Sequence, residues 1–265
     1  MAFSRKTTAL ILSALQAQKV SYFQFGNLSK SFGLAVDQER QLIRSLLRSG
    51  EAIRLRRGQF LLRPADHRGG AWTPSEASVL KSLILDSGGQ YQLCGPIAFQ
   101  RYGWDDQIPN RVHVYNTLES GERKIGAVTL NLIKVASIRL GATEVSITLE
   151  GAELFWPTRA RALLDAVYDW SRFNSLPRGY DWIRAELKRN PAIAADLVEV
   201  TRQYANQGTI RRIGRLLQDS DAPANLVQKL ERTLRSSTSF IPWEPTQPKR
   251  GSIDRRWGVV FNHES

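Results

Sequence analysis

The stretch DQERQLIRSLLRSGEAIRLRRGQFLLRP, residues 37–64, decides the fold of the N-terminal part of the chain. Apolar residues recur at helical spacing in its first half, which predicts a helix with one buried stripe. These residues are Leu42, Ile43, Leu46 and Leu47. Asp37 is the expected N-cap of this helix, and Ser49-Gly50 is its expected end.

Arginines occupy another face of the same predicted helix. Arg40, Arg44 and Arg48 are spaced by four residues, so they line up along the helix, and Gln41 lies beside them. A charged stripe of this kind is often only a solvated face. Its meaning therefore depends on what surrounds it in the sequence.

The second half of the stretch predicts a two-stranded hairpin. Ile53 and Leu55 alternate with Arg54 and Arg56, the pair Arg57-Gly58 supplies a tight turn, and QFLL returns. The tip of this hairpin is basic. It follows the arginine-striped helix directly.

Two further helices are expected upstream. Leu10, Ile11, Ala14 and Leu15 fall on one helical stripe, and the polar Gln16, Gln18 and Lys19 argue against a signal peptide. Residues 25–32 fit a two-turn helix that ends at Gly33, where a left-handed conformation is easy. A helix, a short helix, a striped helix and a basic hairpin form a winged helix-turn-helix, which we assign to residues 1–63.

The charge of the chain is concentrated in this segment. The whole chain of 265 residues has a net charge of +12, and residues 1–63 hold eleven Lys/Arg against three Asp/Glu, a net charge of +8. A compact basic segment is typical of a polyanion binder. The alternative is a basic tail, but tails lack the apolar periodicity found here.

DNA binding follows as the expected function of the winged helix. A helix enters the major groove, where Arg and Gln side chains contact base edges, while basic groups on the wing neutralise phosphates. We predict that Arg40, Gln41 and Arg44 contact bases. The predicted phosphate contacts are Lys30, Arg48, Arg54, Arg56 and Arg57.

The rest of the chain predicts an α+β domain over residues 73–265, after a linker over residues 64–72. Thr73 is the expected cap of its first helix, with Pro74 at the first helical position. Strands are expected near 91–94, 111–116, 127–136 and 145–149, and a last one after Arg256. Helices are expected near 158–173, 178–189, 192–206, 208–218 and 223–235. Strands followed by helices favour the α+β class.

The second domain shows no clear catalytic motif. Asp181 with Glu186-Leu187-Lys188 matches an Asp…Glu-x-Lys nuclease pattern, but it lies in a helical stretch, where residues two apart do not share a face. Cys94 is the only cysteine, and the three histidines are far apart, so we expect neither a metal nor another cofactor. Arg211, Arg212 and Arg215 form either a solvated face or a surface for an acidic partner.

The stretch CGPIAFQRYGWDDQIPNRVHVYN, residues 94–116, resembles the AbiEi family, the antitoxins of type IV toxin–antitoxin systems. ALLDAVYDW, IRRIGRLLQ and DRRWGVVFN further along resemble the same family, so the similarity extends over the whole chain. The resemblance implies a winged helix that represses its own operon, commonly at inverted repeats. It also implies a second domain that counteracts a nucleotidyltransferase toxin without a stable complex. The family is not known for catalytic residues.

We therefore expect a DNA-binding repressor that is not an enzyme and that acts in the cytoplasm, away from membranes. One winged helix has a small footprint, so we expect a dimer on double-stranded DNA of its own promoter. Two alternatives stay open. One is a metal-dependent nuclease that uses Asp181, Glu186 and Lys188, and the other is a protein-interaction module.

Overall fold

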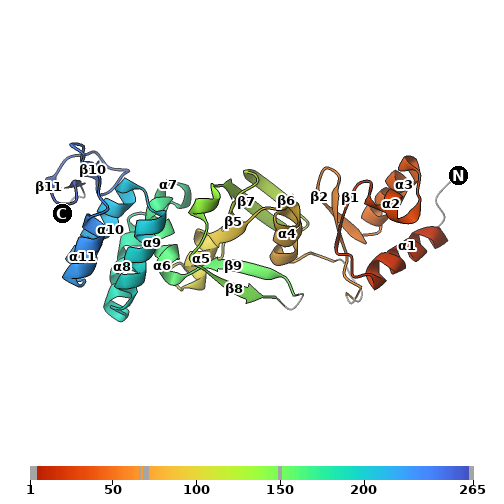
Figure 1. The fold of residues 1–265 in the computed structure, drawn as a ribbon, viewed down its shortest axis with the longest axis horizontal. Coiled ribbons are helices and arrows are strands. Elements are labelled where there is room, and N and C mark those ends of the chain that lie inside the picture. Colours follow the sequence, from red (N-terminus) through yellow and green to blue (C-terminus); the bar gives the residue numbers. More distant parts are fainter. Residues whose placement is uncertain (1–4, 66, 68–71, 149–150, 263–265) are drawn as a thin grey trace.

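The protein has three hydrophobic cores in a row along an elongated molecule (Figure 1). The computed structural model describes residues 5–65, 67, 72–148 and 151–262. The winged helix lies at one end, a β-sheet domain in the middle, and a helical lobe with a small sheet at the other end. The architecture is α+β, as the order of predicted elements indicates.

The N-terminal unit has the winged-helix order of elements. They are α1 (Arg5–Ala17), β1 (Tyr22–Gln24), α2 (Asn27–Phe32), α3 (Val36–Arg48), β2 (Ala52–Arg56) and β3 (Gln59–Leu62). The strands form one antiparallel sheet in the order β1-β3-β2. The short strand β1, which the sequence did not predict, closes this sheet. Leu28, Leu42 and Leu46 are buried between the three helices and the sheet.

The start of α3 differs from the prediction. Asp37 lies inside the helix, and the N-cap is Ala35, whose backbone N–H donates to the side chain of Gln38 over 2.9 Å. Gly33 ends α2 in the left-handed conformation, as predicted, at φ 63°. Its cap N–H donates to the carbonyl of Ser29. The helix therefore begins two residues before the expected start, and the Gln38 side chain satisfies the backbone N–H of Ala35 at its N-terminus.

The sheet β1-β3-β2 contributes side chains to two hydrophobic cores. One face contributes Phe60 and Leu62 to the core of the winged helix, and the other contributes Leu55 and Leu61 to the core of the middle domain. Side chains alternate between the faces of a strand, so a sheet with helices on one side and a second domain on the other buries both. The winged helix is thus packed firmly onto the next domain.

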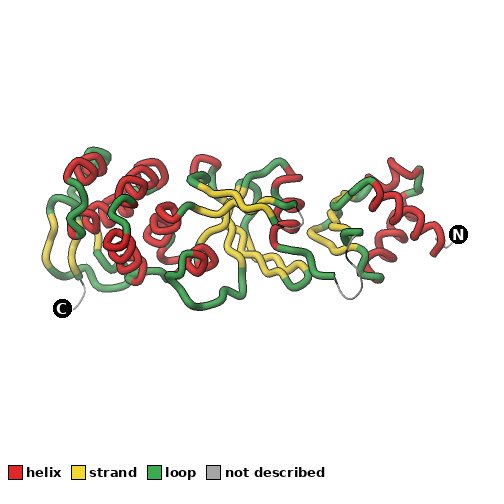
Figure 2. Tube along the Cα trace, turned by 90° about the horizontal axis from the view of Figure 1, so that it is seen from below, coloured by secondary structure: helices red, strands yellow, loops and turns green. Residues whose placement is uncertain are grey.

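The middle domain is built on a four-stranded sheet of order β4-β5-β7-β6, in which β5 and β7 are parallel. A separate hairpin, β8-β9, packs beside β4. The helix α4 lies on the side of the winged helix, and α5 on the other side (Figures 1 and 2). The elements are α4 (Glu76–Leu83), the 3-10 helix η1 (Leu85–Ser87), β4 (Tyr91–Cys94), α5 (Pro96–Arg101), β5 (Val112–Asn116), β6 (Gly121–Ile125), β7 (Val128–Lys134), the 3-10 helix η2 (Ser137–Arg139), β8 (Thr143–Ile147) and β9 (Glu153–Pro157).

Some predicted boundaries in this domain are wrong. Ser75, and not Thr73, caps α4, because its hydroxyl accepts from the N–H of Ser78 over 3.2 Å. The strands β6 and β9 were not predicted. Within the predicted linker 64–72, residues 66 and 68–71 lie outside the described residues.

The C-terminal lobe packs helices around α6, in which every residue from 160 to 167 is buried. The helices are α6 (Arg159–Tyr168), α7 (Trp170–Phe173), α8 (Arg178–Arg189), α9 (Ile193–Tyr204), α10 (Gln207–Asp219) and α11 (Ala224–Glu231). Inside the lobe, Asp165 accepts from Arg161 and Arg139, at 3.1 and 2.5 Å. A buried carboxylate needs such partners, because an isolated buried charge is strongly destabilising.

A small sheet of order β10-β12-β11 covers the end of this lobe. Its strands are β10 (Ile241–Pro242), β11 (Ser252–Asp254) and β12 (Val259–Phe261). The predicted strand after Arg256 is β12. Trp257, just before it, is fully buried against Gly214 of α10, where a Cβ would lie 2.0 Å from the indole ring. Within the described part of the chain, no helix combines the length and apolar character needed to cross a membrane.

Candidate nucleic-acid interface

The outer face of α3 is exposed and polar. Leu42, Ile43 and Leu46 turn inward, and this leaves four predicted DNA-contacting side chains at the surface. They are Arg40, Gln41, Arg44 and Arg48. A helix that is held on one side by a core and is polar on the other has the form needed to enter a major groove.

A buried glutamate of α3 holds the helix-turn-helix together. Glu39 is fully buried, and its carboxylate accepts from the N–H groups of Gly26 and Leu28, at 2.7 and 3.2 Å, and from the Ser29 hydroxyl at 2.6 Å. It therefore satisfies free N–H groups at the start of α2. Its negative charge also interacts favourably with the positive end of the α2 helix dipole. This role was not predicted from the sequence. The signal in the sequence was an acidic residue that falls on the same helical stripe as the buried Leu42 and Leu46.

Phe25 connects the recognition face of α3 with the turn of the wing. Its backbone N–H donates to the carbonyl of Gly58 in that turn over 2.8 Å. The guanidinium of Arg40 lies 5.8 Å from the centre of its ring, and the ring is 42% exposed. The position of Phe25 was not predicted from the sequence. It makes α3 and the wing one continuous surface.

The predicted phosphate-binding residues fall into two groups. Lys30 on α2, Arg54 on β2 and Arg57 in the wing turn are exposed. Arg56 is half-buried, and its guanidinium donates to Gln59 at 2.5 Å and to Ser87 of η1 at 3.1 Å. It also lies 3.8 Å from the carboxylate of Glu119, so it ties the wing to the middle domain.

Few acidic groups oppose this positive face. Glu39 is buried, and Glu51 forms an ion pair with Arg63 at 2.8 Å. Asp37 is exposed and pairs with Arg40 over 3.0 Å. At the surface, such an exposed pair is weak and a competing phosphate can replace it.

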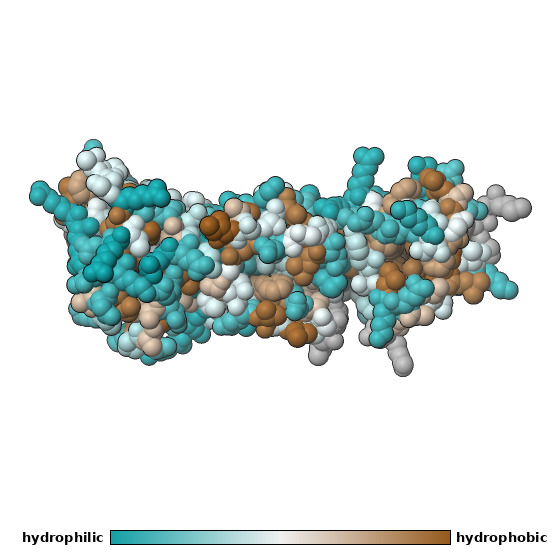
Figure 3. Space-filling view, viewed as in Figure 1, coloured by the Kyte–Doolittle hydropathy of each residue, from teal (hydrophilic) through white to brown (hydrophobic). Residues whose placement is uncertain are grey.

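Hydrophobic side chains are interspersed with the charged ones at this end of the molecule (Figure 3). The exposed ones are Leu10, Phe25 and Val36. Apolar groups next to cations suit a groove in which thymine methyl groups lie beside phosphates.

The prediction of a solvated or partner-binding surface at Arg211, Arg212 and Arg215 is wrong for the first two. Arg211 and Arg212 are each only 7% exposed. Arg211 donates to the carbonyl of Ser239 at 2.8 Å, and Arg212 donates to that of Pro242 at 2.9 Å. Arg215 pairs with Asp219 and Asp254 at 2.6 and 3.1 Å. These arginines hold the last part of the chain on α10, because its carbonyls need buried donors.

Two of the three residues of the nuclease alternative, Asp181 and Glu186, have separate partners. Asp181 is exposed and pairs with Arg184 at 2.9 Å, and Lys188 is exposed. The Glu186 carboxylate is buried and accepts from Trp104 Nε1 at 2.8 Å and from Arg159 at 2.6 Å. Arginines that saturate a carboxylate compete with a metal ion for it. Over the ranges that the structure describes, no three His, Cys, Asp or Glu side chains gather as a metal site.

Comparison with known proteins gives a structural likeness. No family model and no curated protein sequence matches the chain. The crystal structure of the RV2827C protein from Mycobacterium tuberculosis aligns with 98% of this chain and 92% of its own, with a TM-score of 0.58 and 15% sequence identity. The two proteins share a fold along nearly their whole length.

Proposed function

We propose that this protein is a sequence-specific repressor that binds double-stranded DNA through α3 and the wing. The observation that carries the proposal is the exposed face of α3, on which Arg40, Gln41 and Arg44 continue through Phe25 to the wing turn. Arginine and glutamine there supply the paired donors that read base edges. Lys30, Arg48, Arg54 and Arg57 lie around them for phosphates.

The proposal extends to an antitoxin of the AbiEi type that acts in the cytoplasm. The support is the resemblance of residues 94–116 and of the three later motifs to that family. In this function the protein represses its own promoter as a dimer on inverted repeats, and its second domain counteracts a nucleotidyltransferase toxin without a stable complex. The chain performs no catalytic step in this proposal.

The decisive experiment is a DNA-binding titration. The purified full-length protein is titrated into labelled DNA from upstream of its own gene and into a scrambled duplex of equal length, by fluorescence anisotropy at several salt concentrations. A preference of about 10³-fold or more with a steep salt dependence supports a specific repressor. Equal and weak binding to both duplexes contradicts it.

The antitoxin part has its own test. A nucleotidyltransferase toxin of the type that the AbiEi family counteracts is expressed with and without this protein, and growth is measured. Growth rescue by the wild-type chain and by a variant that no longer binds DNA supports a separate antitoxin activity. Rescue that is lost with DNA binding, or absent altogether, contradicts it.

A further inference from the structure

The outward face of α3 carries an acidic side chain in the same row as its cations. Asp37 is the second residue of α3, and Gln41, Arg44 and Arg48 follow it at spacings of four, three and four residues. Residues at these spacings line one face of a helix, and the buried Leu46 lies on the opposite face. Asp37 therefore belongs to the surface that the proposed function turns towards the bases.

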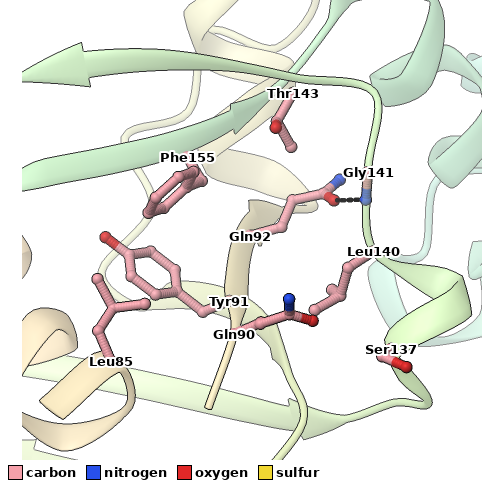
Figure 4. A pocket seen from close by; sticks show the side chains of 9 residues that line it. All are labelled: Leu85, Gln90, Tyr91, Gln92, Ser137, Leu140, Gly141, Thr143 and Phe155. Atoms are coloured by element: carbon pink, nitrogen blue, oxygen red, sulfur yellow. Dashed lines mark hydrogen bonds between the residues drawn. The ribbon is translucent and has the colours of Figure 1, made fainter. Parts of the chain in front are cut away.

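Exposure separates Asp37 from polar groups that hold the fold together. Glu39 is fully buried, and Glu51 is mostly covered in its ion pair. In the middle domain the Gln92 side chain is also buried, and its Oε1 accepts from the N–H of Gly141 over 3.0 Å (Figure 4). The side chain of Asp37, in contrast, is 84% exposed. Its carboxylate is therefore accessible to a ligand.

Arg40 holds this carboxylate only weakly. The Arg40 Nη1 donates to the Asp37 Oδ1 over 3.0 Å, and both side chains are exposed. Ion pairs of this kind contribute little to stability, so the pair does not fix the position of Asp37. A carboxylate has about four acceptor positions. Asp37 can therefore accept a hydrogen bond from a base while Arg40 stays beside it.

A carboxylate at this place opposes general binding to DNA. Residues 1–63 have eleven Lys/Arg against three Asp/Glu, and of these three Asp37 is the exposed one. Phosphates repel it, because like charges brought together at an interface are unfavourable. Such a group increases selectivity where a base offers it a donor, and it weakens binding where a base offers an acceptor.

Cytosine is the base whose major-groove edge fits a carboxylate. Its N4 amino group is a donor with no acceptor beside it, whereas adenine places the acceptor N7 next to its N6 amino group. Guanine presents two acceptors, and thymine presents an acceptor and a methyl group. An ionised carboxylate accepts hydrogen bonds and cannot donate them. Its preferred partner in the major groove is therefore cytosine.

We propose that Asp37 determines sequence preference by accepting a hydrogen bond from the N4 amino group of a cytosine in the major groove. This inference rests on the proposed DNA-binding function. It adds to that function a residue that selects a base without attracting the phosphate backbone.

The test is a cycle of changes in Asp37 and in the cytosines of the DNA. Each cytosine of the upstream duplex is replaced in turn by N4-methylcytosine, which keeps the N–H that pairs with guanine and places a methyl group in the major groove. We expect one such replacement to weaken binding of the wild-type full-length protein about tenfold. The same replacement should change the affinity of the Asp37→Ala variant by less than about twofold. Fluorescence anisotropy at constant salt measures both affinities.

The scrambled duplex gives a second measurement. Asp37→Ala should bind it about threefold more tightly than the wild type does, because the variant lacks a negative charge beside the phosphates. An acidic residue in the first turn also stabilises a helix through its dipole. A residue with that role alone would not couple to any one cytosine.

Asp181→Ala is the matched control. Asp181 pairs with Arg184 three residues further along α8 at 2.9 Å, and both side chains are exposed, as in the pair of Asp37 with Arg40. This variant should bind every duplex as the wild type does. Equal effects of each methylated cytosine on the wild type and on Asp37→Ala would overturn the proposal and leave the DNA-binding function intact. A wild-type protein that does not distinguish the upstream duplex from the scrambled one would overturn both.

Discussion

The three arginines along α3 differ in the contacts that their side chains already make within the protein. Arg40 pairs with Asp37 and lies over the Phe25 ring, and the Arg48 Nε donates to the carbonyl of Arg44 over 3.3 Å. Among the described residues, no hydrogen bond or ion pair holds the guanidinium of Arg44. Arg44 is therefore the arginine whose fork is available for a bidentate contact with a base.

Replacing Arg44 by Ala is expected to weaken binding to the operator by about 1–3 kcal/mol and to relax preference at one base position. Anisotropy titrations against operators with single base changes measure this. Lys188→Ala, an exposed cation on α8 at the far side of the protein, serves as the control and should bind like the wild type. An equal loss on every sequence would make Arg44 a phosphate contact.

Glu39 is expected to be the most sensitive polar residue of the winged helix. Glu39→Ala leaves the N–H groups of Gly26 and Leu28 and the Ser29 hydroxyl without an acceptor, so the free energy of unfolding should fall by about 3 kcal/mol or more. Urea denaturation measures the loss. Glu39→Gln keeps one acceptor oxygen and should cost less, and exposed Asp37→Ala should cost little. Similar losses for Asp37→Ala and Glu39→Ala would contradict this role.

Cys94 provides a probe of local opening. Burial raises the pKa of its thiol well above the ordinary value, and the carboxylates of Asp165 and Asp169 raise it further. Only the thiolate reacts with disulfide reagents, and here it is both disfavoured and inaccessible. We expect no reaction of the native protein with a chromogenic disulfide at neutral pH and complete reaction in denaturant. Rapid reaction of the native protein would show that the core formed by the end of β4 and the C-terminal helices opens readily.

At the scale of the elements, the wing carries two neighbouring arginines with different surroundings. Arg57 is exposed in the turn, whereas Arg56 is bound to Gln59 and Ser87. Arg57→Ala should lower the slope of log affinity against log salt by about 1, because one phosphate contact is lost. Arg56→Ala should leave this slope unchanged and lower thermal stability. The reverse pattern in the same titrations would make Arg56 the phosphate contact.

The helices and the first hairpin could be predicted because their ends carry local signals. Gly33 ends a helix and Gly58 forms a turn, and glycine has strong backbone preferences at both kinds of position. Both N-cap predictions were wrong by two residues, because several polar side chains near each helix start can serve as a cap and the sequence does not show which one does. Ser75 caps α4 in place of Thr73, and α3 begins after Ala35, whose N–H donates to the Gln38 side chain.

Two strands of the middle domain, β6 and β9, escaped prediction because their sequences do not alternate. GERKI in β6 is an edge strand that pairs only with β7 and is mostly exposed, so it lacks an apolar face. β9 runs directly into the cap of α6 at Thr158. The burial of Arg211 and Arg212 was missed for a related reason. Nothing local in IRRIGRLL shows that the last 30 residues return to cover that side of α10.

At the scale of the whole molecule, the sheet shared between the first two cores links the winged helix to the rest of the chain. A fragment of residues 1–63 would expose Leu55 and Leu61, which the middle domain covers in the complete protein. We expect this fragment to self-associate, because exposed contiguous apolar surface drives aggregation. Light scattering after size-exclusion chromatography measures this, with the full chain as control. A monodisperse fragment that binds the operator as tightly as the full chain would contradict it.

The contribution of the β1-β3-β2 sheet to two cores could not be predicted from the sequence. The alternation of Ile53 and Leu55 with arginines indicates one buried face of the sheet, and Phe60 and Leu62 indicate that the opposite face is buried too. The face with Leu55 is covered by residues of α4 and β4, which are distant in the sequence. Likewise, the joining of Phe25 to the wing turn depends on a contact between segments more than 30 residues apart.

The elongated shape has a practical consequence for measurement. The winged helix occupies one end of the molecule and the β10-β12-β11 sheet occupies the other (Figure 1). A protein immobilised on a biosensor chip through its C-terminal sheet would present α3 outward, whereas attachment next to α1 would bring the recognition end against the chip. Kinetic traces recorded in these two orientations should therefore differ in the fraction of active molecules.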